Sequence, residues 1–336
     1  MQKGNFNNDK GFGVEIEFLK PSNLSREDVA VAITTNTDIV TKVEGYNHTT
    51  RNHWKLVTDS SVHANEHGYS GDNELVSPIL YGAEGLYELK QVLSVLNELG
   101  CKVNHTCGIH IHHDVTNKMT SGKKEGQTFL MNLIKFVAKY EHLIYKLVSP
   151  SRLDSRGYST PVRKEFFNYG LGVGVEKRDV KLMVSKLADD CDRKYRYGNG
   201  IGSEMGCPNV QYSRGCGLNL RNVWTRGSVE FRYHNGSTNF EKIANWIVIT
   251  QAIVSTVENT NSVQMNYVPN DVSRGLWRFR KAIGFVATET DSVVFAASNY
   301  MLKRYKELSA RENDYIAHSD YRRYVSKGLE TNREVN

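Results

Sequence analysis

The chain has 336 residues, of which 39% are hydrophobic and 24% charged, and its formal net charge is +6. This composition is that of a globular protein with a sizeable core, and no run of about 18 apolar residues is present to cross a membrane. The first thirteen residues lack the apolar stretch of a signal peptide, so we expect a soluble cytoplasmic protein with no membrane partner. The five cysteines include no C-x-x-C pair, which favours free thiols over a disulfide framework or a zinc ribbon.

Hydrophobic periodicity predicts alternating strands and helices. Strands are expected over 11–19, 36–43, 53–58, 73–78, 108–114, 216–222 and 228–234. Amphipathic helices are expected over 82–100, 125–148 and 240–259. Gly100 suits the end of the first helix, and Thr238 or Asn239 suits the start of the last. The pattern predicts an α+β fold, with helices packed on one face of a mainly antiparallel sheet.

No linker or repeat marks a sharp domain boundary, but the end of the chain differs in character. Residues 263–336 are polar, with interleaved acidic and basic side chains of helical type. We therefore expect one catalytic domain over 1–262 and an appended helical segment over 263–336.

Two glutamates alternate with apolar residues in Gly13-Val14-Glu15-Ile16-Glu17-Phe18. On a strand, this spacing turns the apolar residues into the core and places both carboxylates on the opposite face, about 7 Å apart. Like charges at that spacing repel unless a cation neutralises them. A solvated strand face would show the same alternation.

Two histidines share a face in Cys107-Gly108-Ile109-His110-Ile111-His112-His113-Asp114. The alternation places His110 and His112 together, opposite the two isoleucines. Two imidazoles on one strand face are suited to a metal or phosphate site.

A polar hairpin is expected where the last two predicted strands meet. Glu230, Arg232 and His234 share one face of the second strand, and Asn219 and Arg221 share one face of the first. A glycine-containing turn separates the two strands.

A further carboxylate, Glu74, lies in the strand after Asp72, and the acidic turn Thr58-Asp59-Ser60-Ser61 precedes it. Several strands therefore direct acids, imidazoles or arginines to one side of the sheet. Carboxylates suit Mg²⁺ or Mn²⁺, and arginines supply bidentate contacts to phosphate. The pattern indicates a site for a metal-bound polyphosphate. Neither the P-loop nor G-x-G-x-x-G is present, so ATP would be held in another way.

These motifs, in this order, resemble the E-x-E, G-x-H-x-H and E-x-R strands of the glutamine synthetase superfamily, and most closely its amidoligase branch. That branch typically follows an E-F-R strand with a Gly-x-Thr-like turn and a helix containing tryptophan. This chain has Val229-Glu230-Phe231-Arg232, Gly236-Ser237-Thr238 and Asn245-Trp246. The resemblance covers about residues 11–260. It implies a glutamine-synthetase-like catalytic domain, whose antiparallel sheet has a polar metal and ATP face and helices on the other face.

The resemblance also implies roles for individual residues. The expected metal ligands are Glu15, Glu17, Glu74, His110 and Glu230. The residues expected to face ATP or the acyl phosphate are His112, Arg221 and Arg232, and the two arginines with Glu230 form the expected catalytic set. The residues expected to line the substrate pocket are Asp59, Arg163, Lys194, Arg196 and Asn219. His113 and His234 lie outside the family pattern and receive no role.

The implied reaction is an ATP-dependent carboxylate–amine ligation that uses Mg²⁺ or Mn²⁺. A substrate carboxylate attacks the γ-phosphorus of ATP to give an acyl phosphate, and an amine then displaces phosphate to form an amide or isopeptide bond. The expected partners are small-molecule or peptide carboxylates and amines.

Two other classes of protein stay open. His110-Ile111-His112-His113-Asp114 resembles the H-x-H-x-D opening of metallo-β-lactamase-like zinc hydrolases, although Val115 stands where that motif continues with histidine. The net charge and the 18 tyrosines would suit a module that binds nucleic acid by stacking. The lysines and arginines are scattered, however, so nucleic acid is possible but not indicated.

Overall fold

The computed structural model describes residues 6–152, 159, 161–162, 215–264, 268–286 and 292–309. The chain divides into two compact units. The first, here called the sheet unit, comprises Phe6–Asp114 and His234–Val248. The second, the helical unit, comprises Met1–Asn5, Val115–Tyr233 and Ile249–Asn336. Along the chain, the division falls within one strand and one helix, β7 and α8.

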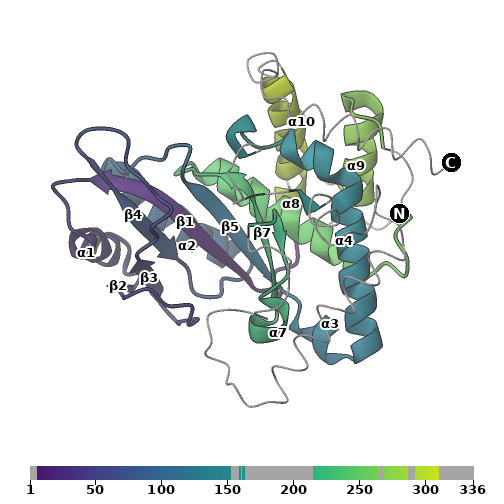
Figure 1. Cartoon of the computed structure of the whole chain (residues 1–336), viewed down its shortest axis with the longest axis horizontal. Helices are drawn as coiled ribbons and strands as arrows, with labels where there is room; N and C mark the ends of the chain where they lie inside the picture. The colour runs from purple at the N-terminus through teal and green to yellow at the C-terminus, as the bar shows by residue number, and fades with distance from the viewer. Residues whose placement is uncertain are drawn as a thin grey trace. The chain divides into compact units, whose positions relative to one another are not determined.

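The sheet unit contains strands in the order β2-β3-β4-β1-β5 (Figure 1). Their bounds are β1 Phe12–Pro21, β2 Thr41–Val43, β3 Trp54–Val57, β4 Tyr69–Val76 and β5 Gly108–Asp114. The pairs β1–β4, β1–β5 and β3–β4 are antiparallel, and β2–β3 is parallel. The predicted α+β fold with a mainly antiparallel sheet is confirmed for this unit.

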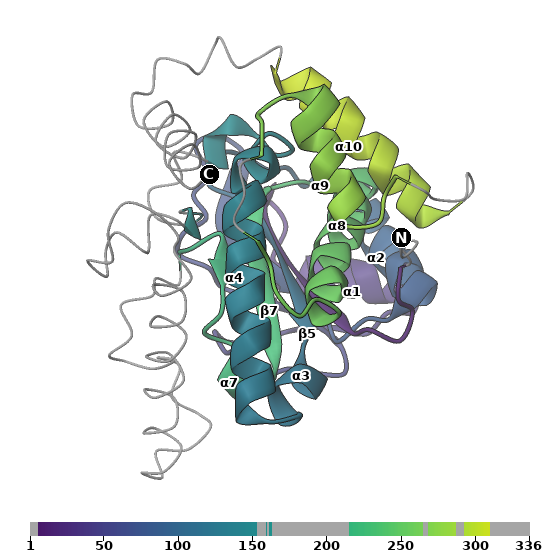
Figure 2. The ribbon, with the colours of Figure 1, turned by 90° about the vertical axis from the view of Figure 1, so that its right-hand side faces the viewer.

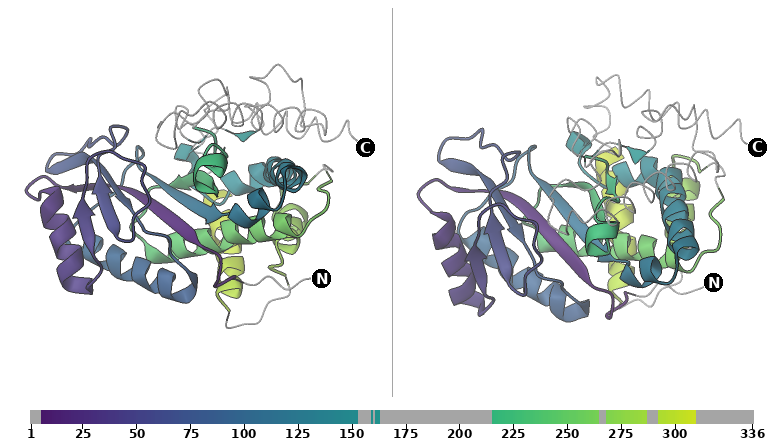
Figure 3. Two further views of the ribbon diagram at one scale, coloured as in Figure 1. Left: turned by 90° about the horizontal axis from the view of Figure 1, so that it is seen from below. Right: turned by 60° about the horizontal axis from the view of Figure 1, so that its bottom comes forward.

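Two helices, α1 (Arg26–Thr37) and α2 (Gly82–Glu98), cover one face of these strands (Figure 3). On that face Leu56, Leu75, Ile16 and Ile109 stand side by side on four neighbouring strands, all fully buried. Trp54 points to the same face and donates a hydrogen bond from its indole nitrogen to Glu88 of α2, at 2.6 Å. Strand alternation therefore leaves the opposite face for polar side chains, as the sequence predicted.

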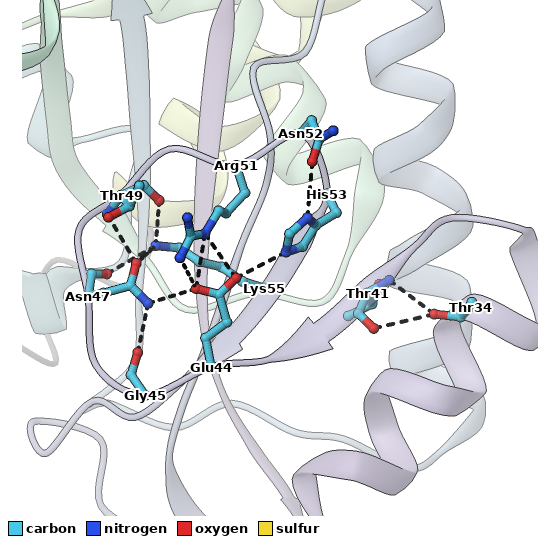
Figure 4. Close-up of polar contacts among 10 residues, drawn as sticks. All are labelled: Thr34, Thr41, Glu44, Gly45, Asn47, Thr49, Arg51, Asn52, His53 and Lys55. Carbon is cyan, nitrogen blue, oxygen red and sulfur yellow. Dashed lines mark hydrogen bonds and ion pairs between the residues drawn. The ribbon is translucent and has the colours of Figure 1, made fainter.

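Helix α1 was not predicted, and the strand expected over 36–43 was wrong in its first half. The structure has helix as far as Thr37 and strand only over Thr41–Val43. Six of the twelve residues of Arg26–Thr37 are β-branched, and they conceal the helix because they lower helix propensity. The helix begins instead with a capping box, in which Ser25 and Asp28 each accept a backbone N–H of the other. The Thr34 side chain then accepts the N–H of Thr41, tying the helix to β2 (Figure 4).

The other predicted helices are confirmed with small shifts. The helix expected over 82–100 ends at Glu98, and Gly100 follows with φ 74°, as a residue just past a helix end commonly does. Helix α8 spans Phe240–Glu258, and its cap is Asn239, whose side chain accepts the N–H of Lys242 at 3.0 Å.

A buried lysine organises the connection between β2 and β3 (Figure 4). Lys55 lies on the polar face of the sheet and is only 3% exposed. Its ammonium donates to the backbone carbonyls of Asn47 and Thr49 and to the side-chain oxygen of Asn47, at 2.8–3.0 Å. These three bonds match the three donors of an ammonium group, so they offset the cost of burying the charge.

The helical unit contains helices and one strand pair. Strand β6 (Leu218–Asn219) pairs antiparallel with β7 (Ser228–Asn235), and the short helix α7 (Val223–Arg226) connects them. The predicted hairpin is confirmed, but its first strand is much shorter than expected. The remaining elements are α3 Thr116–Thr120, α4 Lys123–Tyr145, η1 Pro150–Arg152, η2 Val272–Leu276, α9 Trp277–Ala282 and α10 Val293–Ser309.

Helix α4 is the long helix of this unit (Figure 2). Its Phe136 and Tyr140 contact Phe279 of α9, and the Tyr140 and Phe279 rings stack at 4.9 Å. The helices after residue 263 agree with the helical character expected there. The boundary expected at residue 262 stays a prediction.

Among the described residues, no helix is both long enough and apolar enough to cross a membrane.

Candidate metal site on the polar face of the sheet

The polar face of β1 and β5 joins a carboxylate to two imidazoles. Glu15 and His110 are direct partners across the two strands. Glu15 Oε2 lies 3.0 Å from His110 Nδ1, and Glu15 Oε1 lies 3.1 Å from His112 Nε2. The alternation that the sequence predicted for both strands is confirmed, since these side chains share one face.

Glu17 is held in a different way. One of its carboxylate oxygens accepts the backbone N–H of Gly108 at 2.5 Å, and the other lies 3.5 Å from His110 Nε2. Its side chain is buried, and across the β1–β4 pair it stands opposite Glu74.

Within the described residues of the sheet unit, two sets of ligand atoms converge closely enough to hold a cation. The first, here called the histidine group, consists of Glu15, Glu74 and His110, with one ligand atom from each residue within 4.8 Å of the others. The second, the aspartate group, consists of Glu17, Asp59 and Glu74 under the same limit. Glu74 belongs to both groups. Asp59, which the sequence placed in the substrate pocket, therefore lies beside two expected metal ligands.

The surroundings of Glu15 keep it charged. Burial by itself would raise the pKa of this carboxyl, but the charge of His112 and hydrogen bonds from His110 and His112 outweigh burial. The pKa of Glu15 is held well below its usual value, so the carboxylate is anionic at neutral pH.

The ligand atoms of these two groups fit Mg²⁺ or Mn²⁺. Each group supplies carboxylate oxygens, the ligands that hard cations prefer, and the histidine group adds one imidazole, which Mn²⁺ accepts more readily than Mg²⁺. Among the described residues, no such group combines His110, His112 and Asp114, the set that a zinc site of the H-x-H-x-D kind would need.

The helical unit carries a second cluster of predicted residues around Glu230. This buried carboxylate accepts hydrogen bonds from Arg232 Nη1 at 2.5 Å and from Asn219 Nδ2 at 2.6 Å. The amide of Asn222 adds a longer bond of 3.3 Å. Asn222 was not singled out from the sequence, although an amide close to two predicted site residues was a usable signal. The arginine and the carboxylate thus hold each other in place.

Arg221 was predicted to lie on the first strand of the hairpin, and the structure places it elsewhere. It follows β6 instead of lying on it, and its backbone N–H donates to the Asn219 side chain at 3.0 Å. The expected substrate residues Arg163, Lys194 and Arg196 lie outside the described residues.

The two histidines without a predicted role are both buried. His113 stands opposite Phe12 on the apolar face of the sheet, and burial lowers its pKa well below the usual value, with the charges of Lys10 and His112 acting in the same direction. It is therefore neutral at pH 7. His234 bonds through Nδ1 to the carbonyl of Asn235 and lies 5.6 Å from the Trp246 ring.

One face of an antiparallel sheet thus brings together carboxylates and imidazoles that could hold a divalent cation. Residues 8–254 match the family described as "Putative amidoligase enzyme". The chain belongs to this amidoligase family.

Comparison with solved structures gave weaker similarities. A chain of the complex between the prokaryotic ubiquitin-like protein Pup and its ligase PafA is 11% identical, with a TM-score of 0.36, and the match covers 93% of this chain and 65% of that one. A bifunctional glutathione synthetase from Pasteurella multocida is 12% identical, with a TM-score of 0.37, and the match covers 98% of this chain and 49% of that one. A search of curated proteins gave no significant match.

Proposed function

We propose that the chain is an ATP- and Mg²⁺-dependent amidoligase with a glutamine-synthetase-like catalytic domain, which joins a carboxylate to an amine through an acyl phosphate. The observation that carries the proposal is the pair of cation-binding groups that share Glu74. Two adjacent cation positions suit a polyphosphate substrate, whose oxygens can bridge them.

The residues that would hold the cations are Glu15, Glu74 and His110 at one position and Glu17, Asp59 and Glu74 at the other. Bound there, Mg²⁺ or Mn²⁺ would neutralise the charge of the triphosphate. Glu230 was also expected as a ligand from the sequence, and we keep this as part of the proposal.

The chain's own side chains would orient the reactants. The hydrogen bond from His112 to Glu15 fixes the imidazole beside the first cation position, on the side expected for ATP. Glu230 fixes the Arg232 guanidinium through Nη1, and this guanidinium is the group that we expect to contact phosphoryl oxygens. Arg221 and Asn219 complete the expected phosphate and substrate contacts, together with Arg163, Lys194 and Arg196.

The substrates we propose are a small-molecule or peptide carboxylate and an amine. A cytoplasmic location is part of the proposal. It is supported by Cys101, a buried free thiol in the described residues.

Hydroxylamine trapping tests the reaction. An acyl phosphate reacts with hydroxylamine to give a hydroxamate, so purified protein with Mg²⁺, ATP and a panel of carboxylates should produce hydroxamate and ADP together. Glu15→Gln and Arg232→Ala should each lower this rate by about 10² to 10³, the usual cost of losing a preorganised electrostatic contact.

The matched control is Glu66→Gln, which makes the same change at an exposed carboxylate paired with Lys102. It should keep the wild-type rate. Hydroxamate formation at full rate in both site variants would refute the proposed chemistry.

A further inference from the structure

A bulge interrupts the pairing of β1 with β4 beside the aspartate group. The register is regular as far as Phe18↔Asn73 and shifts before the next pair. On the β4 side of this shift, Asp72 has φ 61°, in the left-handed region. A bulge bends its strand and re-aims the neighbouring side chains. The backbone conformation of β4 at Gly71 and Asp72 therefore depends on what holds the bulge in shape.

Asn73 is the buried centre of this bulge. Its side chain is fully buried, and its amide nitrogen donates to the carbonyls of Gly71 at 2.7 Å and Ser70 at 3.0 Å, with a longer contact of 3.4 Å to Phe18. Its side-chain oxygen accepts Arg26 Nε at 3.1 Å. One amide thus ties both strands and a helix to the bulge. A buried amide with these partners satisfies its own hydrogen-bonding needs while fixing the backbone around it.

Arg26, the first residue of α1, clamps the same bulge from outside. Its guanidinium donates to the backbone carbonyl of Asp72 and pairs with the Asp72 carboxylate at 3.0 Å. The unusual backbone conformation of Asp72 is therefore held by contacts to both its carbonyl and its side chain.

The bulge also positions the turn that carries Asp59. The Asp72 N–H donates to the carbonyl of Val62 at 2.8 Å, and the Val62 N–H donates to the carbonyl of Asp59 at 3.1 Å. Any Cβ at Gly71 would overlap the Val62 carbonyl, so this close approach requires glycine.

We infer that Asn73, supported by Arg26, is a positioning residue for cation binding at the aspartate group. Asn73 is bonded to the bulge that holds the turn of Asp59, whereas Glu15 and His110 are set by the separate pairing of β1 with β5, and Glu74 by its regular pairing with Glu17. This inference rests on the cation site of the proposed function, and it separates the two positions: loss of Asn73 should disturb the aspartate group and spare most of the histidine group.

The test is a Mn²⁺ titration of the full chain without ATP, followed by the electron paramagnetic resonance signal of free Mn²⁺. Asp59→Asn and Glu15→Gln serve as references, because each removes a ligand from only one of the histidine and aspartate groups. Asn73→Ala should resemble Asp59→Asn, with one position weakened by about 10- to 100-fold, as is usual when an outer partner of a metal ligand is lost.

Asn132→Ala is the matched structural control. Asn132 of α4 is also buried, and its amide bonds the carbonyls of Thr260 and Asn261 at 2.9 and 3.3 Å, but it belongs to the helical unit and touches no ligand of the aspartate group. It should lower the melting temperature and leave both Mn²⁺ affinities unchanged. Titrations are run below the melting temperature of every variant.

The outcomes separate the two proposals. If wild-type protein and Asn73→Ala both bind two Mn²⁺ ions with equal affinity, the positioning role is refuted and the cation site stands. An equal loss in Asn132→Ala would also refute it. If wild-type protein binds no Mn²⁺, the proposed function fails and takes this inference with it. Should Asn73→Ala not fold, Arg26→Ala must show the same selective weakening, and unchanged binding there overturns the inference.

Discussion

Glu74 is the residue that the histidine group and the aspartate group share. It contributes a ligand atom to both cation-binding groups, whereas Glu15 and Glu17 each contribute to one of these two. A substitution at Glu74 should therefore remove both positions, and a substitution at Glu15 only one.

The prediction for Glu74→Gln is that neither Mn²⁺ position fills at a concentration that saturates wild-type protein. The amide keeps the size of the side chain but loses the negative charge that a divalent cation requires. Equilibrium dialysis with Mn²⁺ measures the bound ions per chain, and Glu66→Gln is the control. Two ions bound to Glu74→Gln would contradict the shared role.

A buried carboxylate in the helical unit leads to a second prediction. Glu141 accepts the Tyr233 hydroxyl and the Val162 N–H, both at 2.7 Å. Tyr233→Phe removes one donor to a buried acceptor, so we expect the free energy of unfolding to fall by about 1–3 kcal/mol. Denaturant unfolding measures this loss. Tyr87→Phe removes a hydroxyl from a side chain that is 61% exposed and should change almost nothing; an equal loss in both variants would contradict the prediction.

At the residue scale, the sequence indicated the site residues that lie on these strands, because alternation alone assigns a face to Glu15, Glu17, Glu74, His110 and His112. It could not place Asp59 with them. Asp59 follows β3 in a turn, and its position depends on a bulge in a strand that is distant in sequence. Strand alternation carries no information about such a turn.

At the scale of elements, ion pairs and hydrogen bonds to a carboxylate stabilise the connection from β2 to β3 (Figure 4). The Glu44 carboxylate accepts hydrogen bonds from Arg51, His53 and Asn47 at 2.9–3.1 Å. The bond from Arg51 is the largest influence on the pKa of Glu44, which falls from 4.5 to about 2.

The pH dependence follows from this lowered pKa. The stability that Glu44 contributes is fully present above pH 4.5 and is lost as the pH falls towards about 2, where the native carboxylate gains a proton. After allowance for solvent screening, we expect about 1 kcal/mol. Glu44→Gln should be less stable than wild type at pH 7, and the difference should shrink towards pH 2. Melting temperatures across this range measure it, and a constant difference would contradict the prediction.

Elements whose apolar and polar residues alternate with a clear period could be predicted from the sequence. Elements whose residues favour one structure while their caps favour another could not. The predicted strand over 108–114 has the bounds of β5, because isoleucine and histidine alternate from Ile109 to His112. Helix α1 was missed because its β-branched residues favour strand, while its capping box is a local signal of only four residues. Strand β6 is short because the chain turns into α7 directly after Arg221 and Asn222.

For the whole molecule, family membership and site geometry support the same class of enzyme by independent routes. The family match spans residues 8–254, and the two cation groups lie in segments within it. The assignment as a ligase thus agrees with the ligand chemistry of the site.

Cation binding should stabilise the native chain as a whole. A ligand that binds only the folded state adds about 2.7 kcal/mol per site at a concentration near 100 times Kd. Mn²⁺ should therefore raise the melting temperature of wild-type protein and leave that of Glu74→Gln unchanged. Differential scanning calorimetry measures both, and an equal rise in the two proteins would contradict cation binding through Glu74.

One carboxylate in two coordination groups also imposes a thermodynamic linkage. Whatever factor the first cation applies to the affinity of the second, the second must apply to the first. This coupling free energy arises at Glu74, since a single rotamer of its side chain must position ligand oxygens for both ions. Exchanging the metal at one position should therefore change the selectivity of its neighbour, and the two positions should respond to cations as one cooperative pair.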